Sequence, residues 1–95
     1  MYARVTTFQI DPARIPDLVA RMGDFKASSK AMPGVVDTYV AWRADGKGVV
    51  TSVFENKATA DAAAAAGQAV WAGIAGMLKA TPTAEAYDSV EHLSG

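Results

Sequence analysis

The chain lacks cysteine altogether and has a single histidine among its 95 residues. Without cysteine it forms no disulfide, carries no thiolate nucleophile and offers no thiolate ligand to a metal. The spacing of the remaining residues does not gather the three or four ligands that a metal ion needs. We therefore expect no metal and no bound cofactor, with stability coming from packing or association. A composition of this kind suits a reducing cytoplasm, and we expect a cytoplasmic location.

An excess of charge of one sign is also missing. Nine Lys and Arg side chains stand against ten Asp and Glu side chains, which gives a formal net charge of −1. We expect no nucleic-acid partner and no membrane partner, because the chain offers neither a basic patch nor a polybasic anchor. The stretch Met1 to Val5 alternates like a strand and does not have the layout of a secretory signal. Residues 62–78 carry no charge, but they are mostly Ala and Gly, and Ala contributes little to membrane insertion.

What the chain does have is a strong hairpin signal over residues 35–54. Two apolar runs flank the turn-forming cluster at residues 44–48, which contains Asp45, Gly46 and Gly48. This arrangement predicts two antiparallel strands. Each run carries large apolar groups on both alternating faces, so both faces of the sheet are expected to need cover.

A strand is also predicted over residues 2–10, where Val, Thr, Phe and Ile are enriched. Asp11-Pro12 ends it, since Asp is a good N-cap and Pro is tolerated at the first helical position. The helix that follows fades through Lys26 to Lys30 and is stopped by Pro33-Gly34. Its apolar stripe has the spacing of one helix face. The stripe consists of Ile15, Leu18, Val19, Met22 and Phe25.

Beyond the hairpin, an alanine-rich helical region is predicted to begin near Lys57, with Asn56 and Thr59 as cap candidates. Gly67 predicts a break or kink, because glycine in a helix interior costs roughly 1 kcal/mol relative to alanine. A further helix is predicted over residues 68–80, with an apolar stripe of its own.

A last strand is predicted over residues 84–93. Its mixed polarity suits an edge strand or one that reaches across to a partner. The order β-α-β-β-α-β predicts an α+β, ferredoxin-like fold with a four-stranded antiparallel sheet, helices on one face, and residues 1–95 as a single domain. The other face would stay bare and partly apolar. We therefore expect a homodimer in which two sheets close against each other.

Three short segments add to this order. Met32-Pro33-Gly34 runs from the first helix into the second strand, Phe54-Glu55-Asn56 ends the third strand, and Trp71 lies in the last helix. With them, nearly the whole chain resembles the dimeric α/β-barrel proteins of the antibiotic biosynthesis monooxygenase type, which often have an aromatic-Glu-Ser sequence at the end of strand three. The resemblance implies a dimeric α/β barrel. Known members include cofactor-free oxygenases, haem-degrading enzymes and proteins with no established activity.

For the oxygenases, the resemblance implies a pocket between helices and sheet. There a helix Trp and nearby polar groups hold a planar aromatic or quinone-like molecule whose own anion reacts with dioxygen. Trp71 matches that Trp, while Gly67 stands where such enzymes often have Asn. Haem degraders use an Asn on the first strand and a helix His, and both are missing here, which disfavours haem degradation. The alternative is a non-catalytic ligand-binding or structural homodimer of the same fold.

Five residues are substrate-binding candidates, each with a simpler alternative, and no catalytic residue is assigned. Trp71 offers a flat face and an indole N–H, or is an ordinary core residue. Tyr39 and Tyr87 donate to a substrate oxygen and Arg43 stabilises an anion, or all three serve cross-strand and dimer contacts. Asn56 shapes a pocket mouth, or caps a helix.

Two further features have two interpretations each on the sequence alone. His92 is the one histidine of the chain, so it is either a general base or a surface residue near a mobile chain end. The glycines of the last helical region, with their alanine neighbours, either leave a cavity above the sheet or allow close helix packing. They are Gly67, Gly73 and Gly76.

Overall fold

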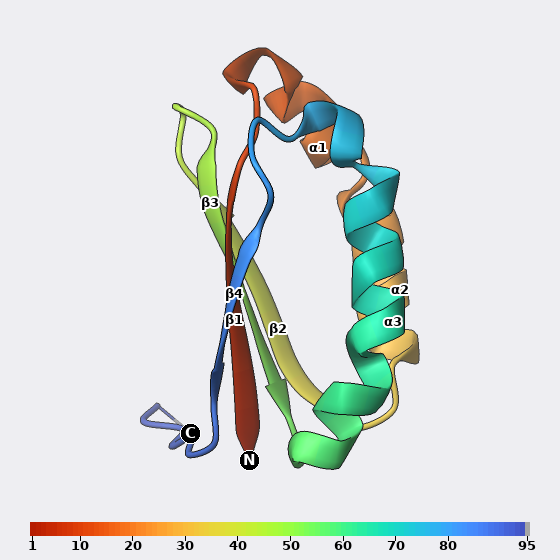
Figure 1. Ribbon diagram of the computed structural model, residues 1–95, viewed down its shortest axis with the longest axis vertical. Coiled ribbons are helices and arrows are strands. Elements are labelled where there is room, and N and C mark those ends of the chain that lie inside the picture. The colour runs from red at the N-terminus through yellow and green to blue at the C-terminus, as the bar shows by residue number, and fades with distance from the viewer. Residues whose placement is uncertain (95) are drawn as a thin grey trace.

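The computed structural model describes residues 1–94, and it confirms the predicted α+β class and element order. The strands and α-helices are β1 (Tyr2–Gln9), α1 (Ile15–Ala20), α2 (Met22–Ala31), β2 (Val35–Trp42), β3 (Lys47–Phe54), α3 (Lys57–Gly73) and β4 (Thr83–Tyr87). Two short 3₁₀ turns, η1 (Pro12–Arg14) and η2 (Ala75–Met77), join them. The four strands form an antiparallel sheet in the order β2-β3-β1-β4. Figure 1 shows the helices together on one side of this sheet.

The hairpin forms as predicted, with its turn held by backbone bonds. Gly46 N donates to Arg43 O at 2.9 Å, and Arg43 N donates to Lys47 O at 2.8 Å. Gly46 has a φ of 89°, and a Cβ there would collide with the carbonyl of Ile10. Only glycine fits such a position without strain. Ile10 N in turn donates to Gly46 O at 2.9 Å, so the hairpin tip is tied to the end of β1.

A register shift in β2 changes which face its first residue occupies. The pairing moves from Val35 opposite Phe54 to Asp37 opposite Val53, with an irregularity between them. Because of this bulge, Val35 packs with Phe54 on the helix side, whereas Tyr39 lies on the opposite side of the sheet. Strict alternation along the sequence predicts Val35 and Tyr39 on the same face of the sheet. That prediction is wrong, because the bulge places them on opposite faces.

The first helix begins as predicted but is divided. The Asp11 carboxylate accepts from Ala13 N at 3.0 Å, which confirms the cap. At Arg21 the backbone has φ −95° and ψ 0°, and its N–H donates to the Leu18 carbonyl three residues back at 3.0 Å. This tighter turn separates α1 from α2.

The helix after the hairpin, α3, continues past the position where a break was predicted. Asn56 Oδ1 accepts from Thr59 N at 2.9 Å, and Thr59 Oγ1 accepts from Asn56 N at 3.3 Å, which makes a capping box. The predicted break at Gly67 is wrong, since α3 runs unbroken to Gly73. The surrounding alanines favour the helix strongly enough to carry one glycine. Of the predicted helix over residues 68–80, residues 68–73 are helical as part of α3, whereas the remainder is wrong because η2 and an extended Leu78 follow.

The last strand is shorter than the predicted residues 84–93. It covers Thr83–Tyr87 and pairs with β1 alone. Tyr87 lies opposite Ala3, so β1 has almost no length left to pair with later residues. Residues 88–94 consequently form no regular element and leave the sheet close to the N-terminus (Figure 1).

The helix-covered face holds two clusters of buried side chains. The bulky cluster consists of Phe8, Ile10, Leu18, Ile74 and Met77, and Trp71 packs against it. The sparse cluster consists of Phe54, Ala60 and Ala63, flanked by Tyr2, Met32 and Val35. No helix within residues 1–94 has the length and apolar character needed to cross a membrane.

Candidate functional site

A hollow of about 660 Å³ lies between α2 and α3, and we call it the interhelical hollow. Its volume is within the range of small-molecule sites. Arg21 and Thr59 line it near the two ends of α3, and Val70 and Pro33 add apolar surface. Its α3 wall consists of Ala62, Ala63, Ala66 and Ala69, and the opposite wall consists of Ser28, Ala31 and Met32.

The alanine wall explains why the space is not filled. Thr59, Ala62, Ala66 and Ala69 follow the spacing of one helix face, which is turned toward α2 and not toward the sheet. Each alanine projects only a methyl group, and Ala31 does the same from α2. Two helix sides that carry little bulk cannot interdigitate, so an apolar groove remains between them.

Among residues 1–94, Arg21 is the one ionisable side chain that lines this hollow. Its Nη1 donates to the carbonyl of Gly73 at 2.8 Å, and its Cζ lies 5.8 Å from the centre of the Phe25 ring. A cation at this carbonyl also suits the negative end of the α3 dipole. Within residues 1–94 the ion pairs are Arg14–Asp17, Arg43–Asp45 and Lys57–Asp61, so Arg21 has no carboxylate partner there.

Trp71 belongs to the core. Its ring centroid lies 5.5 Å from that of Phe8, with the planes tilted by 54°. It lines neither the interhelical hollow nor the second hollow on the far face of the sheet. This matches the alternative of a core residue, and a contact between Trp71 and a substrate stays a prediction. A Cβ built at Gly67, one turn earlier, would meet no atom within 4 Å.

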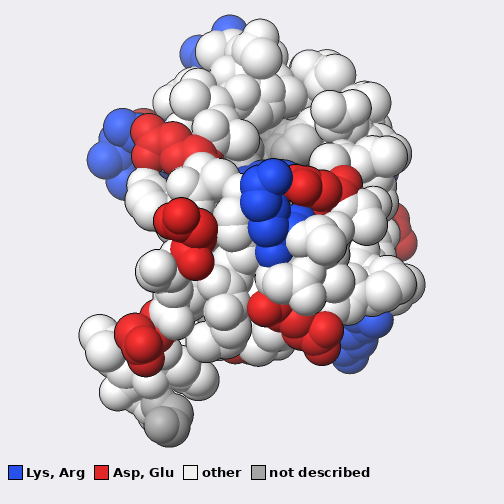
Figure 2. Space-filling model, turned by 60° about the horizontal axis from the view of Figure 1, so that its bottom comes forward, with Lys and Arg blue, Asp and Glu red and all other residues white. Residues whose placement is uncertain are grey.

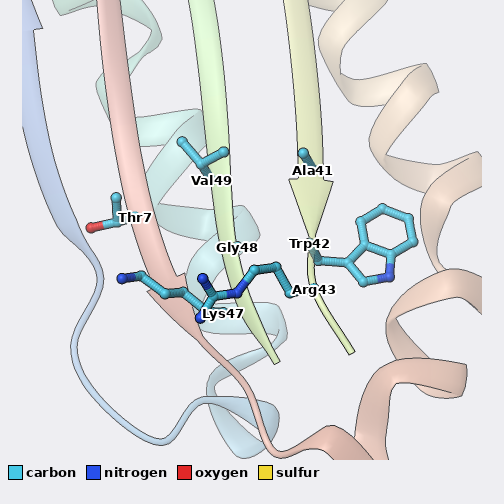
Figure 3. Close-up of a pocket in the computed structure, with 7 residues that line it drawn as sticks. All are labelled: Thr7, Ala41, Trp42, Arg43, Lys47, Gly48 and Val49. Carbon is cyan, nitrogen blue, oxygen red and sulfur yellow. The ribbon is translucent and has the colours of Figure 1, made fainter. Parts of the chain in front are cut away.

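A second, smaller hollow of about 240 Å³ lies at the hairpin end of the open face. Figure 3 shows Arg43 and Lys47 extended across this face near Thr7, while Trp42 turns away toward the helices. Arg43 Nη2 donates to Asp45 Oδ2 at 2.6 Å and Nε donates to Oδ1 at 3.2 Å. This pairing raises the pKa of Arg43 and, with the Lys47 N–H, lowers the pKa of Asp45. Asp45 neutralises Arg43, whereas Lys47 lines the smaller hollow without a carboxylate partner among residues 1–94.

The two tyrosines also lie on the open face, on different strands. Tyr39 is 69% exposed and pairs with Thr51 across the hairpin. Tyr87 is 46% exposed, and its hydroxyl donates to Glu85 Oε2 at 2.7 Å. That hydrogen bond to a carboxylate, with the repulsion between the two negative charges after ionisation, raises the pKa of Tyr87.

The five sequence candidates are therefore not brought together. Tyr39, Arg43 and Tyr87 lie on the open face, Trp71 lies in the helix-side core, and Asn56 caps α3. His92 is exposed in the segment after β4. Among residues 1–94 no group of three or more His, Asp or Glu side chains is placed to hold a metal ion. Acidic and basic side chains lie next to one another on the face shown in Figure 2.

Sequence reasoning missed Arg21 and the alanine wall. The contact between Arg21 and Gly73 joins residues far apart in the chain and leaves no local signal in the sequence. The wall had a signal in the spacing of Thr59, Ala62, Ala66 and Ala69, which repeats every three or four residues.

No known protein-family profile matches the chain, and no curated protein matches it in sequence. Solved structures match it well in shape. A protein of unknown function from Nitrosomonas europaea has a TM-score of 0.80 at 16% identity, covering 99% of this chain and 95% of that one. A structure titled antibiotic biosynthesis monooxygenase has a TM-score of 0.79 at 15% identity, covering 96% of this chain and 100% of that one. The Rv0793 protein of Mycobacterium tuberculosis has a TM-score of 0.75 at 14% identity, with 98% of both chains covered.

Identities this low establish the fold alone. The shared shape extends over nearly the whole of each chain, and the resemblance noted from the sequence is confirmed at that level. The protein has the fold of the antibiotic biosynthesis monooxygenase type.

Proposed function

We propose that this protein binds a planar aromatic or quinone-like small molecule in the interhelical hollow. The observation that carries the proposal is the hollow itself, which has the volume of a ligand site and walls made mainly of methyl groups. An apolar space between two helices suits an aromatic ring system. The hollow lies between the helices, beside the space between helices and sheet that the family resemblance implies.

Cofactor-independent oxygenation is the reaction that we propose for this site, because structural neighbours carry the name antibiotic biosynthesis monooxygenase. In such a reaction an anthrone loses a proton, its anion transfers electrons to dioxygen, one oxygen atom enters the ring carbon and the other leaves as water. The products are a quinone and water, and no cofactor is consumed. The lining offers hydroxyl groups and Arg21, with no carboxylate or imidazole. The substrate would therefore have to ionise without a protein base at the hollow.

A non-catalytic ligand-binding homodimer of the same fold is the second candidate, and the absence of a proton acceptor from that lining favours it. Binding is common to both candidates, and catalysis separates them. The assignment to the oxidoreductases and the cytoplasmic location remain predictions.

The homodimer is a proposal that the open face of the sheet supports. Tyr39 and Tyr87 lie there at 69% and 46% exposure, among partly apolar strands that no helix covers. A second copy facing this surface would cover both rings. Sedimentation velocity at micromolar concentration is expected to give the mass of a dimer, and a stable monomer would exclude this arrangement.

Oxygen uptake with a panel of anthrone-like and quinol substrates tests the reaction. We expect uptake above the protein-free rate with the unmodified chain, and loss of that uptake in Ala66→Leu, which fills the hollow. Ala65→Leu is the matched control, since Ala65 is exposed and lies outside the lining. Trp71→Phe shows whether the indole contributes. If no substrate gives protein-dependent uptake but the hollow still binds aromatic molecules, the non-catalytic candidate stands and the oxygenase is rejected.

A further inference from the structure

We infer that the ligand of the interhelical hollow carries an anionic oxygen, such as a phenolate, enolate or carboxylate, and that the guanidinium of Arg21 pairs with it. The inference rests on the ligand-binding function proposed above and adds the charge of the ligand to it. It concerns the one cation of a lining that otherwise consists of apolar groups and the hydroxyls of Ser28 and Thr59.

The first argument is the missing counter-charge. Within the described part of the chain, residues 1–94, three cations sit within 4.0 Å of a carboxylate, and Arg21 is the one cation lining the hollow and is not among them. Arg21 is half-buried, and the rest of the lining is mainly apolar, with the hydroxyls of Ser28 and Thr59 as its other polar side-chain groups. A charge that is partly removed from water and left unpaired is unfavourable, so an anion entering the hollow gains from its presence.

The second argument is that Arg21 is already held in place. Its Nη1 is fixed on the Gly73 carbonyl at 2.8 Å, and its guanidinium lies over the Phe25 ring at 5.8 Å. A guanidinium has five N–H donors in a planar fork, and the Gly73 carbonyl engages Nη1. The remaining donors are available to an oxyanion, and little side-chain freedom is lost when one binds.

Arg21 also has a purely structural role, since it satisfies a carbonyl at the end of α3. A structural role alone predicts that replacing Arg21 lowers stability and affects every ligand of the hollow alike. Pairing with an anion predicts a loss that depends on the charge of the ligand. The ratio of two affinities for ligands of the same shape therefore separates the two roles.

Two fluorescent probes give that ratio. 1-Anilinonaphthalene-8-sulfonate and N-phenyl-1-naphthylamine share their aromatic rings and differ by one sulfonate. We expect Arg21→Gln to lower the affinity for the sulfonated probe by about tenfold, because a hydrogen bond to a charged group is lost. The affinity for the neutral probe should change by less than about twofold. Arg14→Gln is the matched control, since Arg14 pairs with Asp17 at the surface, and it should change neither affinity.

Arg21→Lys keeps the charge without the fork, so it should lower the sulfonated probe's affinity by an intermediate factor. If thermal unfolding shows that Arg21→Gln does not fold, the affinities of the two probes are compared in Arg21→Lys instead. Equal changes for both probes, or no change for either, would overturn the pairing while leaving the hollow as a binding site. If neither probe binds the unmodified chain, or if Ala66→Leu fails to weaken binding of either, the proposed function fails and the inference with it.

Discussion

The two ends of the helix-covered face are filled differently. At the C-terminal end of α3, Trp71 and Ile74 meet Phe8 in the bulky cluster, and the space above the sheet is closed. Over the first turns of the same helix, Ala60 and Ala63 meet Phe54 in the sparse cluster, and the interhelical hollow runs beside them. The hollow continues along the α2 side of the same helix from Thr59 to Val70, so one unbroken helix packs against the sheet on one side and leaves space on the other. The volume of its side chains decides where a ligand fits.

The largest effect that tests this difference is expected from Phe8→Ala. Phe8 is 5% exposed and packs against both the cluster and Trp71. Its removal should lower the free energy of unfolding by about 3–5 kcal/mol. Met32→Ala, at the edge of the sparse cluster, should cost less than half as much because Met32 already borders open space. Urea unfolding gives the free energy of unfolding of both variants. Equal losses of that free energy would contradict the difference between the bulky and the sparse cluster.

A pair of identical substitutions on α3 gives the next largest effect. Ala60 is fully buried, so Ala60→Leu should overpack the sparse cluster and cost roughly 1–3 kcal/mol. Ala66 is exposed to the hollow, so Ala66→Leu should change the free energy of unfolding by less than about 0.5 kcal/mol. Thermal unfolding of the two variants gives the comparison. If Ala66→Leu proves as costly as Ala60→Leu, the helices pack where we place the hollow.

A smaller effect is expected at the start of α3. Asn56→Ala removes the side chain that accepts from Thr59 N at 2.9 Å, and should cost about 1 kcal/mol. Asn56→Asp keeps the acceptor and should stay near the unmodified chain. Circular dichroism during urea unfolding reports both. A ligand-binding role for Asn56 would instead appear as a loss of probe affinity in Asn56→Asp with stability unchanged.

The smallest effect concerns the hairpin turn on the open face. The pKa of Asp45 is lowered by its hydrogen bonds to Arg43 and to Lys47 N. A carboxyl with a lowered pKa in the folded state contributes stability above its ordinary value of 3.8, and that contribution is lost as the pH falls through the folded value. The stability difference between the unmodified chain and Asp45→Asn should therefore shrink below that pH. It should also shrink in high salt, because the pair is exposed. A constant difference across acid pH would show that the pair contributes nothing.

Features with local causes were predictable from the sequence. Asp11 and Asn56 indicate helix starts, because their side chains accept hydrogen bonds from backbone N–H groups only two or three residues away. Gly46 marks the hairpin because the turn needs a positive φ. With strand alternation, these signals were sufficient for the element order and the fold class.

Features that depend on contacts between residues far apart in the sequence were not predictable. The hollow depends on which side of α3 faces α2, and the contact that holds Arg21 in its lining is to Gly73, 52 residues away in the sequence. β4 ends at Tyr87 because this residue pairs with Ala3, which is next to the first residue of β1. Trp71 offered both a core and a pocket interpretation, because an amphipathic stripe does not say what the indole meets. In the structure the indole meets Phe8, and only the assembled fold brings these two residues together.

The measurement that tests the ligand hollow most directly is a titration with neutral N-phenyl-1-naphthylamine, followed by fluorescence. We expect saturable binding to the unmodified chain, similar affinity in Ala65→Leu, and a loss of at least about tenfold in Ala66→Leu. These two positions are neighbours on α3, and only Ala66 lines the hollow. Equal affinities in the two variants would place the bound probe elsewhere and contradict the interhelical hollow as the site.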